Sequence, residues 1–306
     1  MRGPTPPTAP PTASTDPSGC TERDRSSAPI SVVAEDRATG GGPDGSGGSP
    51  LLGLRGITKH FGAVHALNHV DLDVPAGQIT ALVGDNGAGK STLIKTISGI
   101  WAPSGGQITW DGSPVDIRTP KEADQLGIAT VYQDLALCDN LDIVQNMFLG
   151  HEALSHRLLD ETRMELTAKQ TLADLSVTTV QSVRQLVGSL SGGQRQSVAV
   201  ARAVMRDARL VIMDEPTAAL GVSQTAQVLE LIKTLGDRGI AVIVISHNLN
   251  DVFEVADRIA VLYLGRLVSS GPVAEYDPQR AVELITTGRS ADDPPDGRPG
   301  ITDTEG

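Results

Sequence analysis

A strand, a glycine-rich loop and a helix follow one another at positions 79–97, and this succession constrains the fold more than any other feature. The run at 79–83 is apolar and partly β-branched, as in a buried strand, and 92–97 is typical of a helix. Between them the chain reads Gly84-Asp85-Asn86-Gly87-Ala88-Gly89-Lys90-Ser91, followed by Thr92. This spacing predicts a loop that binds the phosphates of a nucleoside triphosphate, and an ordinary glycine-rich turn is the alternative.

The residue types in the loop explain the predicted chemistry. Glycine lets backbone N–H groups turn inward around phosphate oxygens, and the following helix presents the positive end of its dipole. Lys90 is expected to reach the β- and γ-phosphates, and the hydroxyl of Ser91 is expected to bind Mg²⁺.

The composition indicates that only the middle of the 306-residue chain folds. Residues 1–49 are dominated by Pro, Thr, Ser and Gly, and residues 289–306 are acidic and rich in Pro and Gly. Such stretches have too little apolar surface to offset the entropy lost on ordering, so we expect both tails to be disordered. Residues 50–288 suffice for one α/β domain with a small subdomain.

Charge and cysteine usage disfavour several classes of protein. A formal net charge of −12 argues against a general nucleic-acid binder, because phosphate contacts need a basic surface. Cys20 and Cys138 provide no disulfide framework, which favours a reducing cytosol. The sequence contains neither an apolar run of about 18 residues nor the apolar core of a secretory signal. Work at a membrane would therefore require a partner.

Strand-like and helix-like segments alternate along the rest of the chain. Strands are predicted at 51–57, 66–74, 106–110, 115–117, 127–132, 210–213, 240–245 and, as the last of them, 259–264. The stretch 140–187 is mostly helical in pattern, and helices are predicted at 194–206, 223–235 and 248–255. This alternation predicts a parallel sheet covered on both faces, with a helical insert as a subdomain.

Two carboxylates end one of the apolar strands. Asp214 and Glu215 directly follow the run 210–213, and buried carboxylates need a cationic partner. Beside a phosphate loop Mg²⁺ provides that partner. We therefore expect Asp214 to hold the metal and Glu215 to orient or deprotonate the attacking water. A surface Asp-Glu turn before Pro216 is the alternative.

A second anion site is predicted at Ser191-Gly192-Gly193-Gln194, which follows Leu190. Ser191 can cap the next helix, and the two glycines expose N–H groups beside the positive end of its dipole. One phosphate loop already satisfies one triphosphate, so a second site suggests that two chains share nucleotides. A plain helix start is the alternative.

The order of these segments resembles the ATP-binding cassette of ABC transporters. The matching segments are the phosphate loop, Gln133, residues 190–194, Asp214-Glu215 and Ser246-His247, and the resemblance spans 50–288. It implies an α/β fold: a P-loop NTPase core, RecA-like, with a mostly parallel sheet. It further implies an N-terminal antiparallel β subdomain and an inserted helical subdomain at about 138–189.

The resemblance also implies roles for single residues. Two ATP-binding cassettes would face head to tail, each phosphate loop closed by the partner's residues 191–194. Gln133 would sense Mg²⁺ and the attacking water and link the site to membrane subunits. His247 would hydrogen-bond the γ-phosphate, and Phe61 would stack on adenine. Each residue also has a structural alternative. Gln133 could cap the end of a strand, His247 could be a hydrogen-bonded histidine at a strand terminus, and Phe61 could pack in the core.

The chain departs from the family at one position. Many cassettes carry Asp in the loop that touches the opposite subunit, whereas this chain has Gly221 there. The departure bears on how two sites communicate. Hydrolysis is expected to survive, because Glu215 and His247 are both present.

Within the family, residues 84–87, 127–137 and 218–222 are similar to the ATPases of bacterial monosaccharide importers. That similarity implies a place at the cytoplasmic face of the membrane, bound to permease subunits, and an indirect link to a sugar-binding protein. Many such ATPases fuse two cassettes, so a single cassette implies a homodimer or a pair with another ATPase. The alternatives are an ABC ATPase for another substrate, a soluble non-transport cassette and a regulatory cassette without turnover.

Overall fold

The computed structural model describes residues 49–289. The two tails that the sequence predicts to be disordered, 1–49 and 289–306, lie outside this range apart from their innermost residues, Ser49 and Arg289. Within residues 49–289, no helix has both the length and the apolar character needed to cross a bilayer.

A six-stranded sheet forms the centre of the domain, in the order β12-β11-β3-β10-β9-β6. Five of its strands run parallel and β12 is antiparallel to β11. The strands are β3 (Ile79–Val83), β6 (Ile128–Val131), β9 (Leu210–Asp214), β10 (Ala241–Ile245), β11 (Arg258–Tyr263) and β12 (Arg266–Pro272). Every residue of β3 and β10 is buried, as expected for strands covered on both faces. The predicted α/β class with a mostly parallel sheet is confirmed.

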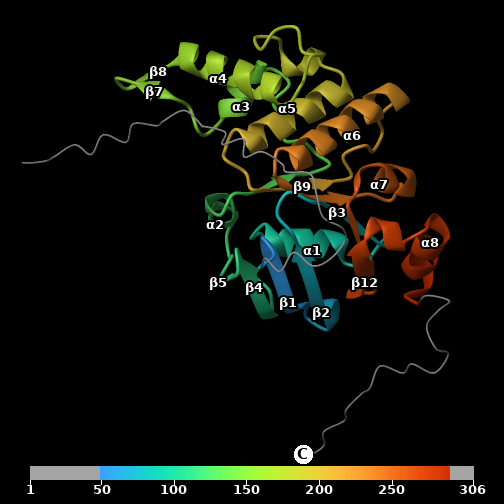
Figure 1. Ribbon diagram of the computed structural model, residues 1–306. Helices are drawn as coiled ribbons and strands as arrows, with labels where there is room; N and C mark the ends of the chain where they lie inside the picture. The colour runs from blue at the N-terminus through green and yellow to red at the C-terminus, as the bar shows by residue number, and fades with distance from the viewer. Residues whose placement is uncertain (1–48, 290–306) are drawn as a thin grey trace, which may run out of the picture. The chain divides into compact units, whose positions relative to one another are not determined.

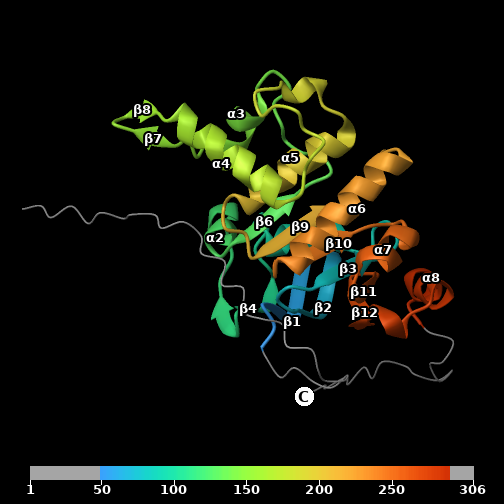
Figure 2. The same cartoon turned by 45° about the horizontal axis from the view of Figure 1, so that its top comes forward.

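Alternate residues of the central strands enter two different cores. Ile212 of β9 and Ile243 of β10 pack with α1 (Lys90–Ile97) and an antiparallel sheet. Val211 and Val242, one residue earlier in each strand, pack with the helices of the opposite face. Figures 1 and 2 show α1 with β1 and β2 on one side and the helices α3 to α6 on the other. Because successive side chains of a strand point to opposite faces of the sheet, the sheet separates the interior into two hydrophobic cores.

The antiparallel sheet has the order β2-β1-β4-β5 and forms the predicted N-terminal β subdomain. Its strands are β1 (Leu52–Phe61), β2 (Val64–Val74), β4 (Gly105–Trp110) and β5 (Ser113–Val115). β1 is longer than the sequence predicts, because residues 58–61 continue to pair with β2.

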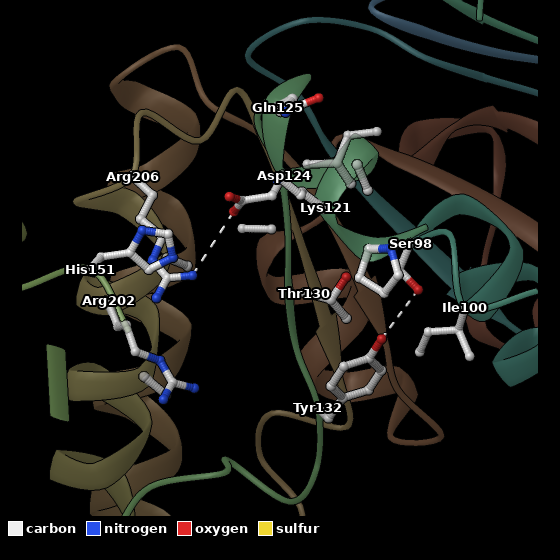
Figure 3. A pocket seen from close by; sticks show the side chains of 16 residues that line it. Ser98, Ile100, Lys121, Asp124, Gln125, Thr130, Tyr132, His151, Arg202 and Arg206 are labelled. Carbon is white, nitrogen blue, oxygen red and sulfur yellow. Dashed lines mark hydrogen bonds and ion pairs between the residues drawn. The ribbon is translucent and has the colours of Figure 1, made fainter. Parts of the chain in front are cut away.

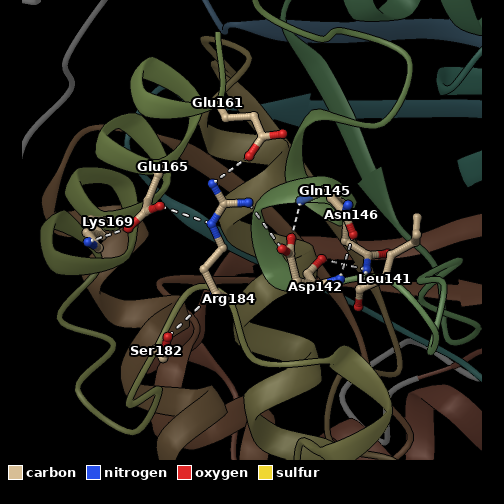
Figure 4. Close-up of polar contacts among 9 residues, drawn as sticks. All are labelled: Leu141, Asp142, Gln145, Asn146, Glu161, Glu165, Lys169, Ser182 and Arg184. Atoms are coloured by element: carbon tan, nitrogen blue, oxygen red, sulfur yellow. Dashed lines mark hydrogen bonds and ion pairs between the residues drawn. The ribbon is translucent and has the colours of Figure 1, made fainter. Parts of the chain in front are cut away.

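The helices of the opposite face include a group inserted between β6 and β9. The helices of this face are α3 (Ile143–Phe148), α4 (Glu161–Asp174), the 3₁₀ turn Val187–Ser189, α5 (Gly192–Val204), α6 (Val222–Asp237) and α7 (Leu249–Val255). The helix α2 (Pro120–Gln125) precedes β6, and its Ala123 packs in the core that contains α1. Arg184 fastens the loop before α5 to this group: its guanidinium contacts Asp142 at 3.4 Å, Glu161 at 3.2 Å and Glu165 at 3.0 Å (Figure 4). One side chain thus connects the loop to the starts of α3 and α4.

The structure also corrects the sequence prediction elsewhere. No helix is predicted at 120–125, where α2 lies. The stretch predicted as mostly helical contains a hairpin, β7 (Leu154–Ser155) and β8 (Leu158–Leu159). Its turn residues His156 and Arg157 have φ of 48° and 68°, values that glycine or asparagine normally signals, so the sequence carries no turn cue. The strand predicted as the last one is followed by β12, a second 3₁₀ turn (Val273–Glu275) and α8 (Pro278–Thr287).

Candidate nucleotide-binding site

The glycine-rich loop connects β3 to α1, as the sequence predicts. Gly89 precedes α1 with φ of 106°, and a Cβ atom there would lie 2.7 Å from the carbonyl oxygen of Ala66. A side chain at this position would force the loop away from β2. α1 begins without a side-chain cap, so N–H groups of its first turn remain available to an anion.

The side chain of Lys90 bends back over the loop. Its Nζ atom donates to the carbonyl oxygens of Gly84 at 2.7 Å and Asp85 at 3.0 Å. Burial lowers the pKa of Lys90, while the charges of Glu215, Asp85 and Asp214 act in the opposite direction. A half-buried ammonium group with only carbonyl partners is well suited to a phosphate, whose charged oxygens are stronger acceptors.

Asp214 and Glu215 lie at the carboxyl end of β9, next to this lysine. Burial raises the pKa of the Asp214 carboxyl, and the neighbouring charge of Glu215 raises it further, while Lys90 and Lys95 only partly offset this. A carboxylate that is disfavoured in this way is a good ligand for a cation. Asp214 and the Ser91 hydroxyl line the same cavity, and this pair of oxygen donors fits Mg²⁺.

Glu215 adopts an unusual backbone conformation. Its φ is 50°, in the left-handed region, and its N–H donates to the carbonyl oxygen of Ile245 at 2.9 Å. This places its Oε1 atom 3.3 Å from Nδ1 of His247, which follows β10. Two residues that are 32 positions apart in the chain thus lie next to each other, and their catalytic roles stay predictions.

An open cavity of about 410 Å³ brings together eight of the predicted site residues. The residues of the phosphate loop and of α1 that line it are Asn86, Gly87, Gly89, Lys90, Ser91 and Thr92. Asp214 and Glu215 line it from β9. Gly84, Asp85 and Ala88 belong to the same loop without lining the cavity.

Several lining residues carry no sequence motif. Val64, His65 and Ala66 come from the start of β2, Ile245 ends β10, and Leu264 and Gly265 form the turn between β11 and β12. Only the sheet order brings these segments to the phosphate loop. Sequence reasoning missed them because no local spacing connects them.

Phe61 and Gln133 do not line the cavity, and neither does His247. Phe61 ends β1 with its ring edge-on to Trp101, at 4.8 Å between ring centroids, and is 42% exposed. Its exposure leaves part of the ring open to a ligand. Gln133 follows β6 and is exposed. Their assigned roles toward adenine and Mg²⁺ stay predictions.

The segment 191–194 does not line the cavity of its own chain. Ser191 caps α5, as predicted: its hydroxyl accepts from the N–H of Gln194, and the Gln194 side chain accepts from the N–H of Ser191 at 2.9 Å. Gln194 also donates to the carbonyl oxygen of Thr179 at 2.6 Å. The segment 191–194 therefore shares no cavity with the phosphate loop of its own chain, and its role as an anion site stays a prediction.

A second, larger cavity lies between α5 and the α2–β6 region (Figure 3). It is an open groove of about 800 Å³. Arg202 lines it from α5 and Arg206 from the turn after α5. Tyr132, which follows β6, lines it as well, and its hydroxyl donates to Ser98 at 3.1 Å. Tyr132 directly precedes Gln133, so the groove borders the segment that the sequence connects to the nucleotide.

The raised pKa of Asp214 leads to a prediction about stability. The folded chain disfavours the charged form of Asp214. The free energy of unfolding therefore decreases as pH rises above 3.8, the ordinary pKa of this carboxyl, and it recovers as pH falls. Asp214→Asn should raise the Tm of the nucleotide-free chain by about 1–3 °C at pH 8. The same variant should lose the additional stabilisation by Mg²⁺ with ATP. Thermal melts with EDTA and with MgATP measure both effects, and a lower Tm in EDTA would contradict the assignment.

Known proteins share both the sequence and the fold. The ABC transporter family model matches residues 67–218. The fructose import ATP-binding protein of Rhizobium meliloti is 47% identical over 80% of this chain and 96% of its own length. The xylose/arabinose import ATP-binding protein of Sulfolobus acidocaldarius is 44% identical over 78% and 95%. A ribose import ATP-binding protein of Rubrobacter xylanophilus is 41% identical, and this chain spans 47% of its length.

Solved structures of ATP-binding cassettes have the same fold as this chain. A nucleotide-free ATP-binding cassette from an ABC transporter superimposes with a TM-score of 0.66 at 26% identity, covering 76% of this chain and 98% of the other. The range matched by the family model, 67–218, includes the phosphate loop and the two carboxylates at the end of β9. On these grounds the chain belongs to the ABC transporter family, as an ATPase of that family.

Proposed function

We propose that this chain hydrolyses ATP to drive the import of a monosaccharide through a separate membrane permease. The observation that carries the proposal is the 47% identity to a fructose import ATP-binding protein across 96% of that protein. The relatives named for xylose/arabinose and ribose import support the same class of cargo.

The chemistry proposed for the site is positioning and charge neutralisation at the γ-phosphate. Lys90 and the N–H groups at the start of α1 hold the phosphates, and Phe61 contributes an aromatic face for adenine. Glu215 orients the attacking water and accepts its proton, while His247 hydrogen-bonds the γ-phosphate. Mg²⁺, held by Ser91, Asp214 and Gln133, would neutralise charge on the phosphate oxygens.

Two chains are proposed to complete each site. The 191–194 segment lies outside its own chain's cavity, which supports a partner cassette, a second copy or another ATPase, that brings these N–H groups to the nucleotide. A cassette bound to ADP and phosphate has been solved as a dimer, and it superimposes with a TM-score of 0.61 at 25% identity. ATP would stabilise the closed dimer because it contacts both chains there and only one chain in the open state.

The permease is proposed to dock in the groove between α5 and the α2–β6 region. The groove is lined by both the central sheet region and the inserted helices, and it borders Gln133. Movement of the helices on dimer closure would therefore be transmitted to a permease loop seated there. This attachment would hold the chain at the cytoplasmic face of the membrane.

A charge placed in the groove should uncouple transport. Ile100 lines the groove and is 42% exposed, so Ile100→Glu replaces an apolar contact in the proposed docking groove by a carboxylate at little cost to folding. Sugar uptake should fall about tenfold or more. Val282→Glu on α8, at a residue 48% exposed and outside the groove, is the matched control and should keep wild-type uptake. Wild-type uptake in Ile100→Glu as well would contradict docking of the permease in this groove.

The cargo is tested in the organism that makes the chain. After deletion of the gene, uptake of labelled fructose, xylose, arabinose and ribose is measured one sugar at a time. We expect uptake of at least one of them to be lost, and to be restored by the wild-type chain but not by Glu215→Gln. Unchanged uptake of all monosaccharides tested would reject this class of cargo, while leaving the ATPase assignment intact.

A further inference from the structure

A buried carboxyl group joins the two loops that carry Glu215 and His247. Asp251, on α7, is only 8% exposed. Its Oδ2 atom accepts a hydrogen bond from the Thr217 hydroxyl at 2.6 Å, and its Oδ1 atom accepts one from Nδ2 of Asn248 at 2.8 Å. Each oxygen thus serves a different loop, and neither partner belongs to the phosphate loop.

The first contact holds the turn after β9. Thr217 lies two residues after Glu215, and the N–H of Ala218 donates back to the Glu215 carbonyl oxygen at 3.1 Å. Glu215 itself has φ of 50°, a conformation that costs energy for a residue with a Cβ atom. Such a conformation persists only where neighbouring contacts hold it, and the Thr217–Asp251 hydrogen bond is one of them.

The second contact holds the turn after β10. Asn248 follows His247 directly, and its side chain also accepts from the N–H of Asn250 at 3.1 Å. Its own N–H donates to the Ser246 hydroxyl at 3.0 Å. The residue next to His247 is therefore fixed on three sides, while His247 itself is 68% exposed in its side chain. The backbone, rather than packing of the imidazole, places His247.

We propose that Asp251 is a positioning residue for ATP hydrolysis: its carboxyl group connects the β9 and β10 turns and so sets the geometry of Glu215 relative to His247. The inference rests on the roles proposed above for these two residues. A general base misplaced by a fraction of an ångström loses much of its contribution to the rate of hydrolysis, so kcat should fall. The affinity for ATP should remain unchanged, because it depends on the phosphate loop.

The test removes the hydrogen bond without changing shape. Thr217→Val should lower kcat for ATP about tenfold, with the KM and the ATP dissociation constant unchanged within about twofold. Thr217→Ser keeps the hydroxyl and should restore most of the rate. Asp251→Asn leaves one side-chain oxygen for two donors, Thr217 and Asn248, and should lower kcat as well. Its effect should add less than fully to that of Thr217→Val, because the two variants share the Thr217–Asp251 contact. Thr171→Val on α4, which removes a hydroxyl bond to the Thr167 carbonyl, is the matched control with wild-type kcat.

A second measurement separates positioning from dimer closure. In the Glu215→Gln background, Thr217→Val should leave the ATP-dependent dimer unchanged on size exclusion; loss of that dimer would overturn the inference. Wild-type kcat in Thr217→Val, or a lower kcat in both Thr217→Val and Thr217→Ser, would overturn it as well. If Glu215→Gln itself retains turnover, the proposed roles fail first, so the two failures are distinguishable.

Discussion

Glu215→Gln should abolish nearly all ATP turnover, lowering kcat by about 10²–10⁴-fold. Glutamine has the shape of glutamate but accepts no proton at neutral pH, so the attacking water loses its base while the phosphate contacts remain. ATP binding should therefore be retained. Because the nucleotide is not hydrolysed, two chains should stay together around it. Steady-state phosphate release measures the first effect, and size exclusion with MgATP measures the second.

The control for this experiment is Glu254→Gln. Glu254 lies on α7, is exposed and pairs with Lys233 at 3.1 Å, away from the cavity. The Glu254→Gln variant makes the same chemical change away from the cavity, and it should keep wild-type ATP turnover. Turnover near the wild-type rate in Glu215→Gln would reject the role of Glu215 as the base and would leave the orientation of the water to other groups.

Lys90→Ala should weaken ATP binding about 100-fold. The ammonium group of Lys90 already donates to two carbonyl oxygens of the loop, and in the complex it would exchange these for phosphate oxygens. Charge-assisted hydrogen bonds are worth about 1.5–3 kcal/mol each, and about 1.4 kcal/mol corresponds to a tenfold change in affinity. Fluorescent-nucleotide titration or calorimetry measures the dissociation constant directly, independently of turnover.

Lys169→Ala provides the matched control for that titration. Lys169 lies on α4, where it pairs with Glu165 at 2.7 Å, and it does not line the cavity. The ATP affinity of Lys169→Ala should stay within about twofold of wild type, since an ion pair on the surface contributes little free energy. Unchanged ATP affinity in Lys90→Ala would argue that the loop does not bind phosphate through this side chain.

The parallel core could be predicted because its signals are local. The apolar runs that became β3, β9 and β10 are each followed by a functional turn, and parallel strands bring their carboxyl ends to one edge. For this reason the sequence alone associates the phosphate loop with Asp214 and Glu215. The capping role of Ser191 was predictable for the same reason, since it depends on four consecutive residues.

Other elements were not predictable because their cues are weak or distant. The hairpin β7–β8 turns at His156 and Arg157, which are not turn formers, and its leucines at 154, 158 and 159 are 57–73% exposed. The segments that complete the cavity, at 64–66 and 264–265, approach the phosphate loop only through sheet order. Asp251 has no motif either, because its two partners come from different turns.

The sequence by itself determined the phosphate loop, its neighbouring carboxylates and the α/β class, since each depends on residues within a few positions of one another. Tertiary structure alone decided which segments share the cavity, how Glu215 meets His247, and that residues 191–194 do not line the cavity of their own chain's phosphate loop. These relations depend on the order of strands in the sheet and on strained turns held by distant side chains. No spacing along the chain encodes them.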